Sequence, residues 1–210
     1  MPVEPTTLVT FIAAALVIVL SPGPDTLLIL RYTIAAGQRT GFATLTGVQI
    51  GLAVHTILAA VGLSLVIASS EILFRAIAIA GAANLGWLAV QGFRSALIDF
   101  GAADGTLRIG AAKAARDALL TNLLNPKVIL LFLALMPNFV VVERGQVPLQ
   151  LTILGIALIA VNTVWQGILT LGAEQARRWL DRPRIQRAVS WGTGTILLTF
   201  AVVLLVEHVI

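Results

Sequence analysis

Long apolar stretches separated by short polar connections dominate this chain. Six of them are long enough to cross a bilayer as helices, since a span needs about 20 mostly apolar residues. They cover approximately residues 7–31, 41–68, 72–98, 117–139, 147–173 and 188–210. None shows the two-residue alternation of a barrel strand, and every backbone N–H and C=O must be paired in hydrocarbon. The pattern predicts an all-α integral membrane protein with six transmembrane helices.

The connections divide the six spans into two halves of three. The first half covers residues 1–98, the second covers residues 117–210, and a polar, Gly/Ala-rich cytoplasmic connection at 99–116 joins them. Because each half holds an odd number of spans, the second half must enter the membrane from the opposite side. We therefore expect a single membrane domain, residues 1–210, built from two inverted halves.

Positive charge is distributed unequally between the connections. Eleven of the 14 Lys and Arg residues lie in or beside the first, third and fifth connections, and two lie in the second and fourth. Positively charged connections stay on the cytoplasmic side, so both termini are predicted to lie on the outer side. The net charge of +4 then indicates anionic lipid rather than nucleic acid as the partner of the basic residues.

Composition supports the membrane assignment. Hydrophobic residues make up 58% of the chain and charged residues 11%, whereas a soluble domain carries about 25% charged residues. Cys is absent, which excludes disulfides and thiolate metal sites. No stretch of the chain remains for a separate soluble domain.

Two of the apolar spans are interrupted by proline beside a charged residue. The first interruption is Ser21-Pro22-Gly23-Pro24-Asp25 and the second is Asn125-Pro126-Lys127, each in the opening span of its half. Proline removes one N–H and displaces the carbonyl four residues earlier, so Pro126 frees the carbonyl of Asn122. The first and fourth helices are therefore expected to be broken. Interrupted spans at corresponding positions of two halves point to the substrate site of a secondary transporter.

The interruptions offer a ligand both kinds of hydrogen-bonding group. Freed carbonyls accept from an ammonium group, and the N–H groups that begin each new half-helix donate to a carboxylate. A zwitterionic amino acid needs both. The candidate site for substrate and coupling ion therefore comprises Pro22, Gly23, Pro24, Asp25, Asn122, Asn125, Pro126 and Lys127.

Asp25 and Lys127 are the only charges well inside the six spans, where each costs about 2.5–3.5 kcal/mol. We expect the two side chains either to approach each other or to line one hydrated cavity. The alternative is that Asp25 only caps the second half-helix, favoured by the helix dipole, while Lys127 extends to the headgroups.

Further polar residues inside the spans are weaker candidates for the cavity: Gln49, His55, Asn84, Asn162 and Gln166. Asn162 and Gln166 share one helix face at i, i+4 spacing, with Trp165 adjacent. Amides between membrane helices more often hold the helices together. His55 is either a proton relay or, as the absence of a carboxylate partner in the sequence favours, a neutral His bonded to a backbone or hydroxyl group.

The two interruptions also carry a resemblance to a known family. Asn125-Pro126-Lys127, within residues 122–139, resembles the fourth-span signature of the LysE family of amino-acid exporters, and Ser21-Pro22-Gly23-Pro24-Asp25 resembles its first-span motif. The similarity continues through Gly47, Gly51 and the block that begins at Gly81. Where the family usually has Tyr in the third span, this chain has Asn84, which leaves the substrate open.

This resemblance implies a secondary transporter of the bacterial inner membrane that exports amino acids or their derivatives. It implies the proton gradient as driving force, no cofactor and no resident metal. The expected partners are a small-molecule substrate, protons and lipid. The small-residue pairs Gly37/Gly41 and Gly47/Gly51 favour close helix packing within one chain over a homodimer interface, which stays open.

Three other classes of function fit the sequence less well. A divalent-metal exporter needs several carboxylates, and Asp25 is alone within the spans. An intramembrane enzyme needs paired carboxylates or a Ser/His arrangement, and neither is evident around Asp117 or His55. A non-transporting structural protein does not account for two polar interruptions.

Overall fold

The computed structural model of the chain describes residues 2–63 and 109–173, with isolated positions between 79 and 90 and between 175 and 206. Helices and short connections make up the two continuous segments, which contain no strand. The all-α prediction holds for this part of the chain. The third and sixth predicted spans are described only at isolated positions, so neither is tested as a continuous helix.

The first segment consists of two helices that meet at the first interruption, followed by a long helix. Helix α1 (Pro5–Leu20) and helix α2 (Pro24–Ala36) each begin with proline in the first turn, where the missing N–H costs nothing. The two are bent by 55° relative to each other. Helix α3 (Gln38–Leu58) starts after Gly37, whose φ of 85° suits glycine alone, and continues into a π-helical turn, Ala59–Leu63.

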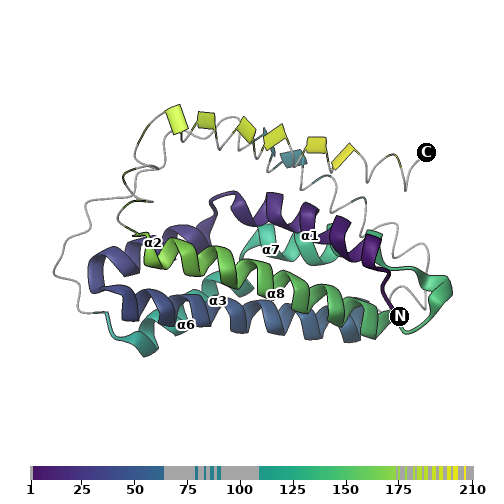
Figure 1. The fold of residues 1–210 in the computed structure, drawn as a ribbon, viewed down its shortest axis with the longest axis horizontal. Helices are drawn as coiled ribbons and strands as arrows, with labels where there is room; N and C mark the ends of the chain where they lie inside the picture. Colours follow the sequence, from purple (N-terminus) through teal and green to yellow (C-terminus); the bar gives the residue numbers. More distant parts are fainter. Residues whose placement is uncertain are drawn as a thin grey trace.

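The second segment repeats this order. Helix α6 (Ala111–Leu123) is followed by α7 (Pro126–Leu130), and the pair that runs from α6 to Phe139 is bent by 49°. After α7 come a π-helix (Leu131–Leu135) and two short 3₁₀-helices (Met136–Phe139 and Val142–Arg144). Helix α8 (Val147–Leu171) then runs back beside α3 (Figure 1).

Two described helices, Gln38–Gly62 and Val147–Leu171, are long and apolar enough to cross a membrane alone. They correspond to the second and fifth predicted spans. Each bent pair would add one crossing if it forms a single span. Helix α6 begins at Ala111, ahead of residue 117, where the apolar stretch of the predicted fourth span begins. Its first turns carry Lys113 and Arg116 and therefore lie outside that apolar stretch.

Small residues let α3 lie close to two neighbours. A Cβ added to Gly47 would lie 2.1 Å from the carbonyl oxygen of Ala115 on α6, and one on Gly51 would lie 2.4 Å from Asn122 Oδ1. On the other side, a Cβ on Gly155 of α8 would lie 2.3 Å from the side chain of Thr56. The Gly47/Gly51 pair therefore serves packing within the chain.

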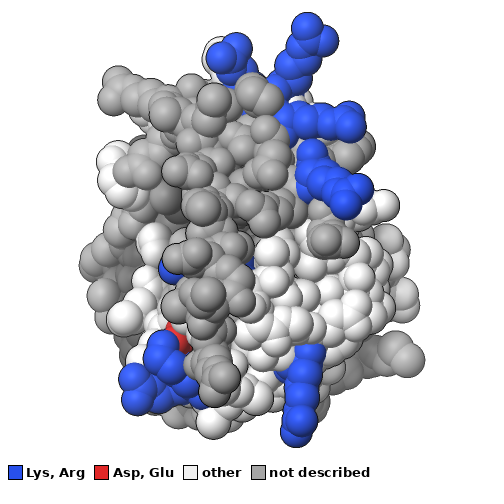
Figure 2. Space-filling view, turned by 90° about the vertical axis from the view of Figure 1, so that its left-hand side faces the viewer, with Lys and Arg blue, Asp and Glu red and all other residues white. Residues whose placement is uncertain are grey.

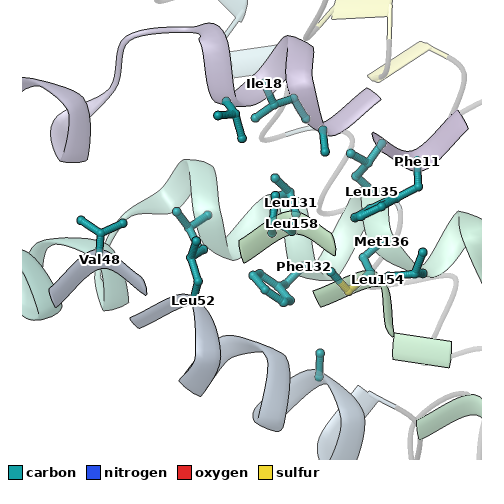
Figure 3. Close-up of a cluster of buried hydrophobic side chains, with 14 of the residues drawn as sticks. Phe11, Ile18, Val48, Leu52, Leu131, Phe132, Leu135, Met136, Leu154 and Leu158 are labelled. Carbon is teal, nitrogen blue, oxygen red and sulfur yellow. The ribbon is translucent and has the colours of Figure 1, made fainter. Parts of the chain in front are cut away.

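The apolar core lies between α1, α3, α8 and the helical turns after α7 (Figure 3). Phe11 of α1 packs edge-on against Phe139, with ring centroids 5.2 Å apart. Gln150, which is 1% exposed, ties the loop before α8 to that helix through the Val141 N–H and the Val141 and Gly145 carbonyls. The loop's Arg144 also forms an ion pair with Glu4, ahead of α1.

The opposite end of the bundle, where α2 joins α3 and α6 begins, is basic. Figure 2 faces this end and shows far more Lys and Arg than Asp and Glu. Its exposed cations include Arg31, Arg39, Lys113 and Arg116. Asp117 Oδ2 accepts hydrogen bonds from Tyr32 and Lys113, each at 2.9 Å, and so links α2 to α6 here.

Candidate functional site

The two interruptions, about 100 residues apart in sequence, are joined directly by side chains. Asp25 Oδ2 accepts hydrogen bonds from Asn122 Nδ2 at 2.9 Å and from Asn125 Nδ2 at 3.1 Å. Asp25 is 7% exposed, and the two asparagines are buried as well. The carboxylate of the first interruption is thus held by the amides that flank the second.

Lys127 completes the connection in the other direction. Its Nζ donates to the carbonyl oxygen of Ser21 at 2.6 Å, across from the second interruption to the first. A Cβ added to Gly23 would lie 3.5 Å from Lys127 Cδ, so the lysine stem passes beside the glycine. Asp25 and Lys127 both line one cavity, and no ion pair joins these two described residues.

Proline occupies the same place in the new helix at both interruptions, but the two helices are capped differently. Pro24 and Pro126 both stand in the first helical turn, each followed by its charged residue. Asn125 Oδ1 accepts from the Lys127 backbone N–H at 3.0 Å, which is an N-cap bond. Gly23 has no side chain to do the same for α2. The first N–H groups of α2 therefore have no side-chain cap.

Helix dipoles act oppositely on the two charges. The N-terminus of a helix carries partial positive charge, which favours Asp25 and disfavours Lys127. The Lys127 ammonium is compensated by the carbonyl of Ser21, just after the C-terminal end of α1, where partial charge is negative. Lys127 therefore destabilises the start of α7, which indicates that it serves function rather than helix formation.

A cavity of about 40 Å³ lies between the interruptions. Its polar lining comes from Asp25, Thr26, Asn122, Asn125, Lys127, Asn162 and Gln166, and its apolar lining includes Ile18, Leu52, Leu131 and Leu158. The last four come from α1, α3, the turn after α7 and α8, and their side chains converge in Figure 3. Since one water needs about 10–15 Å³ by this measure, the cavity holds only a few.

One carboxylate oxygen remains free in this lining. Asp25 Oδ1 is buried and has no hydrogen-bond partner, while Oδ2 takes both amides. An unpaired buried oxygen of an acid is costly, so this atom is a ready acceptor for water or for a ligand's ammonium group. Asn122 Oδ1 is also unpaired, but it lies against Gly51.

Of the weaker candidates among the described residues, two line the cavity and two lie behind its lining. Asn162 and Gln166 line the cavity, and Gln49 bonds to both from behind. His55 lies outside the lining; its Nε2 is 3.4 Å from the carbonyl oxygen of Asn122, and its ring stacks on Phe132 with centroids 5.4 Å apart. The Asn122 carbonyl also accepts from the Asn125 backbone N–H at 3.1 Å, so the proline does not leave it without a partner. Asn84 lies outside the described residues.

Sequence reasoning missed two residues of the site. Ser21, 6% exposed, supplies the carbonyl that holds Lys127, although it belongs to the first interrupted motif. Thr26, also 6% exposed, lines the cavity one residue after Asp25. Its place in the first turn of the new half-helix was the available signal. Pro22, Pro24 and Pro126 shape the interruptions and are absent from the lining.

Comparison with known proteins identifies the family. The sequence model of the family described as LysE type translocator matches residues 16–208 of this chain. The chain is 34% identical to the homoserine/homoserine lactone efflux protein of Salmonella typhi, over 85% of this chain and 86% of that one. It is 28% identical to the leucine efflux protein of Enterobacter sp. (strain 638), over 91% and 90%.

A further relative, the membrane protein YrhP of Bacillus subtilis (strain 168), is 31% identical over 93% of this chain and 96% of that one. No solved structure matches the chain. The resemblance predicted from the two interrupted motifs is confirmed, and it extends over nearly the whole sequence. The protein belongs to the LysE family of translocators.

Proposed function

We propose that this protein is a secondary active transporter that exports small amino acids or their derivatives across the bacterial inner membrane. The observation that carries the proposal is the buried Asp25 carboxylate, held between two broken helices with one oxygen free. A buried charge in a membrane protein is costly and marks a functional site by default.

The site suits a cargo that carries a primary amine. The free oxygen of Asp25 accepts from an ammonium group, while Lys127 and the α2 N–H groups, which lack a side-chain cap, favour a carboxylate. The cargoes in the names of the relatives, homoserine, homoserine lactone and leucine, share the amine. Asp25 is the one carboxylate among the residues that line the cavity, whereas divalent metals bind several.

Alternating access accounts for the small size of the cavity. About 40 Å³ is too little for an amino acid, since ligand pockets usually measure about 300–1,000 Å³. Cargo therefore enters when the two halves move apart on one side, around the cross-linked interruptions. Proton exchange at Asp25 is the proposed coupling step, because this carboxylate is shared by both halves.

The proposed orientation follows from charge. Six helices in two inverted halves, with both termini periplasmic, would place the basic end of Figure 2 in the cytoplasm. Helix α1 begins at the other end, beside Arg144. Each bent pair then counts as one broken span.

An efflux screen tests the proposal. Cells are loaded with labelled amino acids, and their release is followed with and without the protein, before and after a protonophore collapses the gradient. We expect the protein to accelerate release of at least one small amino acid, and the protonophore to remove the acceleration. Release that is equally fast without the protein for every amino acid and derivative would contradict it.

A glycine behind the site provides a second test. In Gly51→Ala the new methyl group displaces Asn122, which weakens its hydrogen bond to Asp25. We expect the initial efflux rate per inserted protein to fall about fivefold, since the displacement removes part of a hydrogen bond to a charged group, which contributes about 1.5–3 kcal/mol. Gly167→Ala on α8 is the matched control, because its Cβ meets nothing within 4 Å. Equal rates in the two variants would show that Asn122 does not position Asp25.

A further inference from the structure

A second cavity, the basic-end cavity, lies where α2 ends, α3 begins and α8 ends. Its volume is about 300 Å³, which reaches the range of about 300–1,000 Å³ that is usual for ligand pockets. The end of α8 lies beside α2 here (Figure 1), and Leu30 of α2 packs with Leu169 and Ala173. Unlike the central cavity between the interruptions, this one has room for a small amino acid.

Two threonines give the basic-end cavity hydrogen-bond acceptors. Thr33 Oγ1 donates its hydrogen to the Ile29 carbonyl at 2.6 Å, and Thr170 Oγ1 donates to the Gln166 carbonyl at 2.7 Å. A hydroxyl group has one hydrogen and two acceptor lone pairs. Each threonine has therefore used its hydrogen, and its oxygen can only accept from a ligand. Gln38 also lines the cavity and carries both kinds of group.

The same kind of bond is common elsewhere in the described helices. Thr46, Thr152 and Thr163 each donate to the carbonyl four residues earlier, at exposed positions. The bond by itself therefore indicates no site. Thr33 and Thr170 differ because both are buried and converge from two helices on one cavity.

The charge distribution at this end favours a cation inside the cavity and an anion outside it. None of the described residues that line the cavity is charged. Helix α2 ends there at Ala36 and α8 at Leu171, where partial charge is negative, and the start of α3 at Gln38 offsets only one of these two ends. The exposed Arg31 and Arg39 of the same end attract a carboxylate.

The basic-end cavity lies close to the central cavity. On α8, Thr170 follows Gln166 of the central lining by one turn, and on α2, Thr33 follows Thr26 by two turns. Each turn of an α-helix rises about 5.4 Å. A ligand in the basic-end cavity is therefore within a few turns of Asp25.

A closely packed layer separates the two cavities. Ile29 and Leu30 of α2 are fully buried. A Cβ added to Gly41 of α3 would lie 2.1 Å from Thr33 Oγ1 and 2.8 Å from Thr170 Cγ2. Three helices thus meet at this level, and they must separate before a ligand can pass from one cavity to the other.

We propose that the basic-end cavity is the entry site for cargo, where Thr33 and Thr170 bind the ammonium group of a small amino acid before that group reaches Asp25. The amino acid enters with its amine first and its carboxylate towards the arginines. The inference rests on the proposed export function and its orientation, and it assigns the first binding step.

Cysteine labelling tests the charge preference of the cavity. The chain contains no Cys, so a single introduced thiol reports on one position. Ile34→Cys places it in the lining, and Ala112→Cys, exposed on α6 at the same end, is the control. Inside-out vesicles are treated with an aminoethyl or a sulfonatoethyl thiosulfonate. We expect the ratio of the two rates to favour the ammonium reagent at least about tenfold more at residue 34, since charge-assisted hydrogen bonds are the strong ones.

Protection by small solutes shows which group of the cargo is recognised. Butylamine, butyrate and 2-aminobutyrate are added at equal concentrations during labelling. We expect butylamine and 2-aminobutyrate to slow the labelling of Ile34→Cys, and butyrate to leave it unchanged. None should slow the labelling of Ala112→Cys. Protection by butyrate that equals protection by butylamine overturns the inference.

Substitutions separate a binding role from a structural one. Thr33→Val and Thr170→Val keep the shape and remove the oxygen. For uptake of labelled leucine or homoserine into inside-out vesicles, each should raise KM at least about fivefold and leave the maximal rate within about twofold, as expected when binding before the transport step is lost. Thr163→Val, which loses the same kind of bond at an exposed position, should change neither. A lower maximal rate with unchanged KM overturns the inference.

The labelling outcomes are independent of transport. Equal rate ratios at the two cysteines, or labelling of Ile34→Cys by the impermeant sulfonate reagent only in right-side-out vesicles, overturn the entry site and leave the exporter in place. If labelling favours the ammonium reagent but the efflux screen finds no export, the proposed function fails. The entry role then fails with it, and the cavity remains a binding site for amines.

Discussion

Asp25→Asn is expected to abolish export while the protein still inserts into the membrane. Asparagine has the same shape, and its carbonyl oxygen can still accept from Asn122 and Asn125, so its NH₂ group replaces the free Oδ1 and presents a donor where an ammonium group needs an acceptor. It also removes the charge that would hold an ammonium group and the only titratable carboxylate in the cavity lining. We expect a loss of at least about 30-fold, because removing one partner of a buried charged pair costs about 2–5 kcal/mol.

The measurement is the initial efflux rate divided by the amount of protein in the membrane. Glu143→Gln is the matched control, since it makes the same change of acid to amide at an exposed residue of the loop before α8. It should stay within about twofold of the unaltered protein, as most surface substitutions have small effects. If Asp25→Asn keeps a third or more of the original rate, the carboxylate is not part of the transport cycle.

Lys127→Met is expected to be the other severe variant. Methionine retains the stem that passes beside Gly23 but removes the ammonium that binds the Ser21 carbonyl. The hydrogen bond from the second interruption to the first is then lost. The cavity also loses the ammonium group that would attract the carboxylate of the cargo. We expect at least about a tenfold loss of efflux, since hydrogen bonds to charged groups contribute about 1.5–3 kcal/mol.

Lys113→Met serves as its control. Lys113 forms an exposed ion pair with Asp117 at 2.9 Å, and such pairs contribute about 0–1 kcal/mol. A double variant of Asp25 and Lys127 adds a sharper readout. Residues that act as a unit are strongly non-additive, so the double variant should be no slower than Asp25→Asn alone. If the fold losses of efflux in the two single variants multiply in the double variant, the two residues act in separate steps.

Much of the fold follows from residue pattern alone. Proline and its effect on the backbone are local, so the two interruptions could be placed to the residue, and the apolar lengths located α3 and α8. The start of α6 was harder to place, because Lys113 and Arg116 lie in its first turns and fall outside the apolar stretch. Alanine, the best helix former, dominates residues 111–118 and is the sequence signal for these turns.

The contacts of the site were less accessible to sequence reasoning. Which amide reaches Asp25 depends on the rotation of α6 and on its closeness to α3, and both are set by Gly47 and Gly51. Opposite charge alone does not decide which acceptor the Lys127 ammonium binds. The lysine instead meets a carbonyl, because the end of α1 offers a nearer acceptor than the carboxylate already held by two amides.

The unequal caps at the two interruptions have a consequence for directionality. In the proposed transport cycle, two identical inverted halves would exchange conformations and regenerate the same contacts, so the empty protein would face either side equally often. Here Asn125 closes one helix start and Gly23 leaves the other open. If the chain alternates as proposed, its inward-open and outward-open conformations therefore differ in free energy. One of the two is then preferred before any gradient acts on the protein.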